Sequence, residues 1–121
     1  MTEIQNPKQG RYDLEERTLK FANNTNEYVN KLPKSIPNFE EGKQLVRSAG
    51  SVGANYIEAN EALSKKDFVM RIKICRKEAR ESEYWLKLSQ PTKEQETMKA
   101  RLVQEATELR KIFGSIIEKS K

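Results

Sequence analysis

Hydrophobic residues recur along this chain at spacings of three and four, the pattern of helices that bury one side. The first such helix is predicted from Leu14 to Leu32, after an N-cap at Asp13. Its apolar side consists of Leu14, Phe21, Tyr28, Val29 and Leu32, with Thr18 and Thr25 completing the seam. Pro33 and Pro37 then close the helix, because proline restricts the residue before it and has no amide proton.

A second helix is predicted from Phe39 to about Ala62, capped by Asn38 together with Glu41. Its core seam is Leu45, Ala49, Val52, Tyr56, Ala59 and Leu63. A second line, made of Val46, Gly50, Gly53 and Ile57, widens the predicted buried face. Each glycine in a helix costs about 1 kcal/mol relative to alanine. The two glycines therefore predict that other backbones come close to this central helix.

A third helix is predicted from Lys65 to Leu88, capped by Ser64 with Asp67. Its buried side is Phe68, Ile72, Cys75, Ala79, Ser82 and Leu86. Four further apolar residues fall partly off that side: Val69, Ile74, Trp85 and Leu88. Surplus aromatic and aliphatic residues of this kind indicate a subunit contact.

A fourth helix is predicted to begin after Pro91 and Thr92, with Gln95 as the partner of the cap. Its seam is Met98, Leu102, Ala106, Leu109, Phe113 and Ile116. Four amphipathic segments with short links predict an all-α protein, an antiparallel up-down-up-down four-helix bundle over residues 13–121. Residues 1–12 show no apolar period and are predicted to form a flexible N-terminal arm.

Composition fits one helical domain. The chain has 121 residues, 34% of them charged, with only five Gly and four Pro. It contains no apolar run of the roughly 18 residues that would span a membrane, and no apolar signal core near its start. Its one cysteine, Cys75, cannot form an internal disulfide and suits a reducing compartment. We therefore expect a cytoplasmic protein.

Candidate chemistry is sparse, because the chain has no histidine, the commonest general base and metal ligand. Cys75 lies in the apolar seam of the third helix, where a structural role is expected and not a nucleophilic one. We expect no metal, no cofactor and no enzymatic activity.

Polar residues line a second side of the two central helices. On the second helix these are Arg47, Ser51, Asn55 and Glu58, and on the third they are Arg71, Glu78 and Glu81, with Trp85 beside them. If the two sides meet, arginine and glutamate pair while Asn55 bridges, giving a polar network or a subunit contact. The sequence leaves three alternatives open: a structural network, a solvated face, or a cleft that binds a small ligand or substrate.

The first half of the third helix is the most basic segment of a chain whose net charge is +5. Its cations are Lys65, Lys66, Arg71, Lys73, Arg76 and Lys77. Such a cluster can follow the phosphate backbone of RNA or DNA. A solvated basic face is the more common explanation, because Lys73 and Lys77 fall where a bundle helix normally meets water.

Residues 44–88 carry a family resemblance. Its most specific pieces are RSAGSVGAN from Arg47 to Asn55, Glu58-Ala-x-x-Ala, Ser64-x-Lys-Asp-Phe68, and Glu78-x-x-Glu81 leading to Tyr84-Trp85-Leu86. They resemble the small bacterial four-helix bundle proteins encoded by intervening sequences inside 23S ribosomal RNA genes. The resemblance implies an up-down four-helix subunit in a homopentameric ring, without established enzymatic activity.

A related branch of that family includes the accessory protein of diversity-generating retroelements, which binds nucleic acid and a reverse transcriptase through a basic surface. This chain departs from that branch in detail, so the function is not transferred. The leading hypothesis is a non-enzymatic oligomeric scaffold that binds RNA, DNA or a protein partner through charged faces. The alternatives are a ligand-binding protein or enzyme using the polar stripe, and a pure assembly module.

Overall fold

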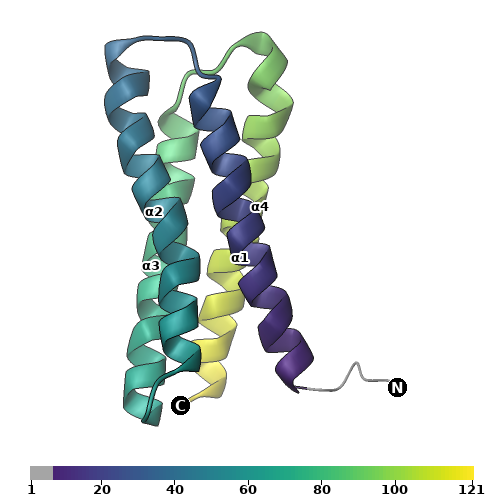
Figure 1. The fold of residues 1–121 in the computed structure, drawn as a ribbon, viewed down its shortest axis with the longest axis vertical. Coiled ribbons are helices and arrows are strands. Elements are labelled where there is room, and N and C mark those ends of the chain that lie inside the picture. Colours follow the sequence, from purple (N-terminus) through teal and green to yellow (C-terminus); the bar gives the residue numbers. More distant parts are fainter. Residues whose placement is uncertain (1–6) are drawn as a thin grey trace.

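The computed structural model describes the backbone of residues 7–121 and the side chains of residues 13–121. Its long helices are α1 (Pro7–Asn30), α2 (Ile36–Asn60), α3 (Lys65–Leu88) and α4 (Glu96–Lys119), and a 3₁₀ turn, η2 (Lys93–Gln95), precedes α4. Each long helix runs antiparallel to the one before it (Figure 1). The predicted all-α, up-down-up-down bundle is confirmed over these residues.

The first helix begins earlier than its apolar pattern indicates. The backbone is helical from Pro7, a residue type that the first turn of a helix accepts, so Asp13 lies inside α1 and is not its N-cap. Of the arm predicted over residues 1–12, residues 7–12 belong to α1, and residues 1–6 lie outside the described residues. An apolar period marks where a helix is buried, and a polar turn can extend the helix beyond that point.

The start of α2 corrects a second cap. Ser35 is the N-cap, and its Oγ accepts a hydrogen bond from the amide of Asn38 at 3.1 Å. Pro37 therefore lies in the first turn of α2. The buried side chain of Asn38 donates to the carbonyls of Pro33 and Gln90, and its Oδ1 accepts from the amide of Gln90 at 3.0 Å. Asn38 thus joins the α1–α2 loop to the α3–α4 loop.

Other hydrogen bonds reinforce this end of the bundle. The hydroxyl of Tyr28, on α1, lies 2.6 Å from the hydroxyl of Ser89, which follows α3. Gln95 donates to the carbonyl of Tyr28 at 3.3 Å, and Lys99 of α4 donates to the carbonyl of Ser89 at 2.9 Å. All four long helices are therefore tied together near these two loops.

The predicted cap of α3 is confirmed, because Ser64 Oγ accepts from the amide of Asp67 at 3.1 Å and the helix has the predicted bounds. The core follows the predicted seams, with Phe21, Tyr28, Leu45, Ala49, Val52, Tyr56, Ala59, Ile72, Cys75, Ala79, Leu86, Leu102, Ala106, Leu109, Phe113 and Ile117 buried. Leu63 was wrongly placed in the core. It is 99% exposed, because α2 ends at Asn60 and the helical period stops there.

The second line of α2 is buried only in part. Gly53 lies against α1, where a Cβ would come within 2.9 Å of Thr18 Oγ1, but a Cβ on Gly50 would meet nothing within 4 Å. Val46 and Ile57 are 39% and 51% exposed. The prediction of a closely packed neighbouring helix is therefore confirmed at Gly53, which lies against α1. It is wrong at Gly50, because the side of α2 that carries Gly50 faces outward.

The two glycines give opposite expectations for alanine. Gly53→Ala should lower the free energy of unfolding by about 1 kcal/mol or more, since overpacking against buried Thr18 outweighs the gain in helix propensity. Gly50→Ala should raise it by up to about 1 kcal/mol, because only the propensity changes. Chemical denaturation of both variants is the measurement. Adding Thr18→Ala removes Oγ1 but leaves Cβ 3.2 Å from the new methyl group, so it should restore part of the stability that Gly53→Ala loses. The absence of any rescue would contradict the proposed contact.

Candidate functional site

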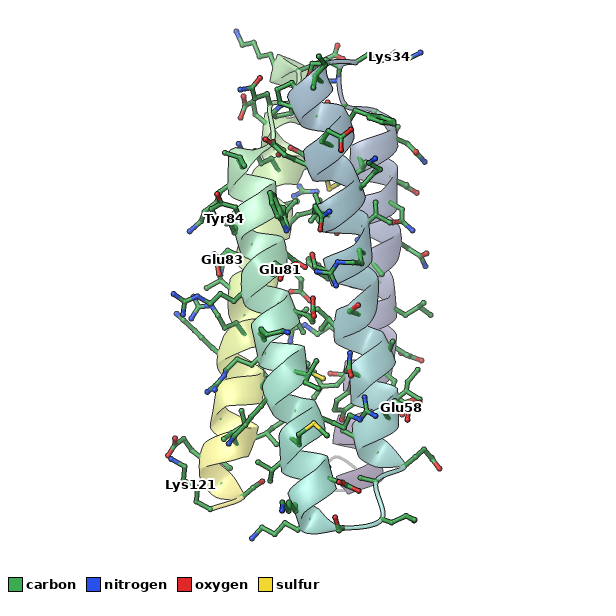
Figure 2. All side chains as sticks on the ribbon, turned by 90° about the vertical axis from the view of Figure 1, so that its left-hand side faces the viewer. Lys34, Glu58, Glu81, Glu83, Tyr84 and Lys121 are labelled. Atoms are coloured by element: carbon green, nitrogen blue, oxygen red, sulfur yellow. The ribbon has the colours of Figure 1, made fainter. Side chains whose placement is uncertain are left out.

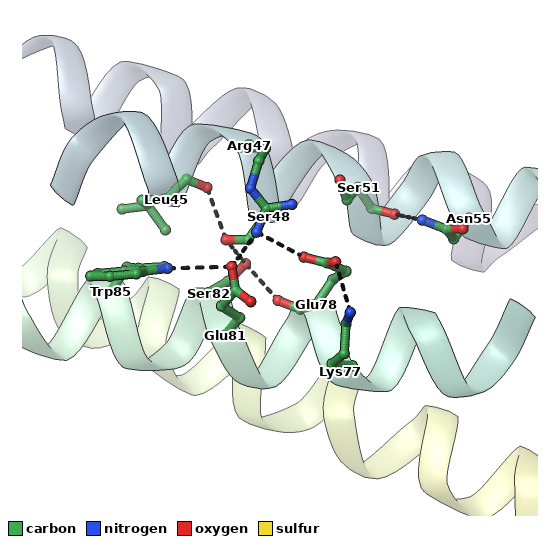
Figure 3. A network of polar contacts seen from close by, with 10 residues as sticks. All are labelled: Leu45, Arg47, Ser48, Ser51, Asn55, Lys77, Glu78, Glu81, Ser82 and Trp85. Carbon is green, nitrogen blue, oxygen red and sulfur yellow. Dashed lines mark hydrogen bonds and ion pairs between the residues drawn. The ribbon is translucent and has the colours of Figure 1, made fainter. Parts of the chain in front are cut away.

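A polar network crosses the contact between α2 and α3 (Figure 3). The guanidinium of Arg47 pairs with the carboxylate of Glu81 and lies 3.5 Å from Glu78. The indole of Trp85 also approaches Glu81, at 3.5 Å, and the ammonium of Lys77 lies 3.9 Å from Glu78. The structure thus brings together four residues of the predicted stripe, Arg47, Glu78, Glu81 and Trp85.

The carboxylate of Glu78 is the most enclosed charge of this network. Its side chain is only 8% exposed, and its Oε1 has no hydrogen-bond partner among the described residues. Charge pairing with Arg47 therefore offsets the unfavourable burial of Glu78.

Beneath these charges lies a pair of buried serines that sequence reasoning did not select as a polar contact. The hydroxyls of Ser48 and Ser82 are 2.8 Å apart, and each also bonds to a backbone carbonyl of its own helix. Both residues are fully buried. Ser82 was predicted in the core seam of the third helix. That Ser48 lies opposite it could not be predicted, because the two residues are 34 positions apart and meet only once α2 packs against α3.

The remaining stripe residues lie further along α2. Asn55 accepts a hydrogen bond from Arg71 at 3.0 Å, and its Nδ2 donates to the backbone carbonyl of Ser51 at 2.9 Å. The side chain of Glu58 is exposed and makes no hydrogen bond or ion pair with the described residues. Arg71, predicted with the basic cluster, is thus directed toward α2 and bound there.

A separate basic surface runs along the side of α3 that faces α4. Lys66, Lys73, Arg80 and Lys87 recur every seven residues and therefore follow one line of the helix. Together with Arg76 and with Arg110 of α4 they form what we call the basic face. Of the predicted cluster, Lys66, Lys73 and Arg76 lie on this face, Lys65 is the first residue of α3, and Lys77 is directed toward Glu78.

The basic face encloses one carboxylate, that of Glu83. Its side chain is 12% exposed and lies 3.1 Å from both Arg110 and Lys87. Burial raises the pKa of Glu83, but hydrogen bonds from Lys87, Arg110 and Thr107 outweigh burial and hold this pKa below its ordinary value. Glu83 is therefore ionised near neutral pH, and its charge is taken up by two cations.

A groove of about 360 Å³ opens between α3 and α4 beside this carboxylate, lined by Arg80, Glu83, Tyr84, Lys87 and Arg110. Figure 2 shows Glu83 and Tyr84 on the side of α3 toward α4, and Glu81 on the side toward α2. Sequence reasoning missed Arg80, Lys87, Arg110 and Tyr84. The seven-residue spacing could have revealed Arg80 and Lys87, but Arg110 and the groove require knowledge of the α3–α4 packing.

A larger groove, of about 920 Å³, lies at the corner between α1 and α2. Val29, Leu32, Ile36, Phe39 and Val46 are its apolar lining residues. Phe39 and Ile36 are 65% and 81% exposed. An apolar surface therefore continues from this groove along the outer side of α2 to Ile57.

The one cysteine is engaged in the core. Cys75 is fully buried, and this burial raises the pKa of its thiol to about 12, so a thiolate nucleophile does not form at neutral pH. Among residues with described side chains, no group of three or more Cys, Asp or Glu is arranged to hold a metal ion. None of the described helices combines the length and hydropathy that crossing a membrane requires.

The comparisons with known proteins agree on the family. Residues 11–115 match the sequence profile of the 23S rRNA-intervening sequence protein. The chain is also similar to a crystal structure from Bacteroides thetaiotaomicron, a protein with unknown function from the S23 ribosomal protein family, with 34% identity and a TM-score of 0.77. This match covers 89% of the present chain and 97% of the other. No curated protein matches the chain. The predicted resemblance is confirmed.

Replacing Arg47 with an uncharged residue tests whether Arg47 offsets the unfavourable burial of the Glu78 carboxylate. We expect Arg47→Met to lower the free energy of unfolding by about 1–3 kcal/mol, because a buried carboxylate loses its partner. Glu78→Gln in the same chain should restore most of the loss, and chemical denaturation measures both. Lys43→Met, which breaks the exposed pair with Glu40, is the matched control with little expected effect. If Arg47→Met lowered the free energy of unfolding no more than Lys43→Met does, the inference that Arg47 stabilises the buried Glu78 would be wrong.

Proposed function

Because this chain belongs to the 23S rRNA-intervening sequence protein family, in which the similar solved structure has unknown function, we propose its role from its surfaces. It is a non-enzymatic helical scaffold that binds nucleic acid along the basic face. The observation that carries this proposal is the line of cations on α3, whose one enclosed carboxylate, Glu83, is already neutralised by Lys87 and Arg110. The unpaired Cys75 supports a reducing, cytoplasmic setting for this role.

The polar stripe supports a structural role more than a catalytic one. Arg47 is matched by Glu78 and Glu81, and Arg71 by Asn55, so these groups are used within the protein. A catalytic cleft would instead present polar groups that await a substrate. This contrast favours the scaffold over the ligand-binding alternative.

We also propose that the protein assembles with copies of itself. Leu19, Phe39 and Ile57 are more than half exposed on the outer side of α1 and α2, and Met70 is 45% exposed on α3 beside half-buried Ile74. These two apolar surfaces lie on different helices, so a contact between them would be head-to-tail and could close into a ring. The family resemblance gives five subunits as the expected ring size.

Nucleic-acid binding is tested by charge reversal. We expect the chain to bind a short RNA with an affinity that falls steeply as salt rises, because each neutralised phosphate releases counterions. The triple variant Lys73→Glu, Arg80→Glu, Lys87→Glu should weaken binding by about 100-fold or more and flatten the salt dependence, as measured by fluorescence anisotropy.

The matched control reverses three exposed cations away from α3: Lys20 of α1, Lys31 in the turn after α1, and Lys43 of α2. The variant Lys20→Glu, Lys31→Glu, Lys43→Glu makes the same change in net charge. We expect a smaller loss from this control. Equal losses would assign binding to net charge alone and not to the basic face. If the unaltered chain shows no salt-dependent binding, the proposed function is wrong.

Assembly is tested by sedimentation at micromolar concentration. The unaltered chain should sediment as a closed oligomer, and Val46→Glu with Ile57→Glu should yield monomers of unchanged helicity, because two charges would be buried in the contact. Leu63→Glu places a charge on an apolar residue that is 99% exposed in a loop, and it should leave the oligomer intact. A stable monomer of the unaltered chain would contradict the assembly.

A further inference from the structure

We infer that the groove between α3 and α4 is a binding site for single-stranded nucleic acid, with one base stacked on the ring of Tyr84 and the adjoining phosphate held by Arg80. The inference rests on the proposed function and deepens it, because it selects one form of nucleic acid and one point of contact. Its basis is the juxtaposition of an exposed aromatic ring with cations in one groove of about 360 Å³.

The ring of Tyr84 is available and held in place. Tyr84 is 58% exposed although it is a large aromatic residue near the C-terminal end of α3, a helix that packs against both α2 and α4. Its ring makes a T-shaped contact with Trp85, with centroids 5.0 Å apart and planes at 72°. A T-shaped contact occupies at most one face of the Tyr84 ring, so an exposed face is left on which a base can stack.

The charges beside the ring are arranged to hold a phosphate. Arg110 and Lys87 share the carboxylate of Glu83, at 3.1 Å each, which positions their side chains along the groove. Arg80, by contrast, is exposed and makes no hydrogen bond or ion pair with the described residues. Arg80 is thus the uncommitted cation at the rim, four residues before Tyr84 and therefore one helical turn away.

This combination selects single strands over a duplex. In a duplex the base faces are covered by neighbouring bases, so that a protein side chain reaches base edges and the backbone but has no base face to stack on. The groove is also too small for the width of a duplex but has room for a base and its phosphate. Stacking on an aromatic ring and contact with backbone phosphates are the two features by which proteins bind single strands without sequence preference.

The test compares a fluorescein-labelled 12-nucleotide RNA with the same RNA annealed to its complement, by anisotropy at fixed salt. We expect the single strand to bind more tightly, and Tyr84→Ala to weaken single-strand binding by about 10-fold with little effect on the duplex. Tyr84→Phe should retain binding, since the ring remains. The salt dependence of Tyr84→Ala should stay unchanged, whereas that of Arg80→Ala should become shallower, because only the second variant loses a phosphate contact.

Trp85 is the one tryptophan of the chain, so its fluorescence reports on the neighbouring ring without a label. Unlabelled single-stranded RNA should change this fluorescence in the unaltered chain and in Tyr84→Phe. Circular dichroism of Tyr84→Ala controls for folding, which an exposed position should not disturb.

The inference is overturned if Tyr84→Ala binds the single strand as well as the unaltered chain does, or if it loses equal affinity for both forms. Either result would leave salt-dependent binding by the basic face in place. Absence of salt-dependent binding to both RNAs would instead overturn the proposed function, so the two failures are distinguishable.

Discussion

The close packing of α2 against α3 determines where the other features of the molecule lie. Ser48 and Ser82 meet hydroxyl to hydroxyl at 2.8 Å in a fully buried position, which only small side chains allow. At this spacing the longer Arg47 reaches across to Glu81 and Glu78 on the facing helix. The small residues therefore create both the seam and the charged network that covers it.

The same packing divides the cations of α3 between two uses. Arg71 and Lys73 are two residues apart and so point to different sides of the helix. Arg71 is directed toward α2, where it bonds to Asn55, while Lys73 belongs to the basic face. The network stabilises the subunit, and the cations on the other side stay available because Glu83 engages only Lys87 and Arg110.

The local pattern of apolar and polar residues was sufficient to predict that four helices form, most of their buried residues, and the cap at Ser64, because these depend on residues three or four apart. It failed where the partner is distant. Asn38 resembles a cap in the sequence, yet its partner Gln90 lies 52 residues away. Gly50 faces outward although α1 contacts α2 at Gly42 and Gly53 on either side of it, so its exposure depends on how α1 lies around α2. The groove at Tyr84 has the same origin, since Arg110 reaches it from another helix.

The hydrogen bonds around Asn38 have a consequence for the motion of the helices. Where two helices meet on small residues such as Ser48 and Ser82, few side chains interdigitate to oppose one helix sliding along its neighbour. Asn38 opposes such sliding at one end, because a shift of the α3–α4 loop relative to the start of α2 would break both of its hydrogen bonds with Gln90. Small residues thus set the distance between α2 and α3, while Asn38, with the Tyr28–Ser89 bond beside it, holds the longitudinal register of the helices at this end of the bundle.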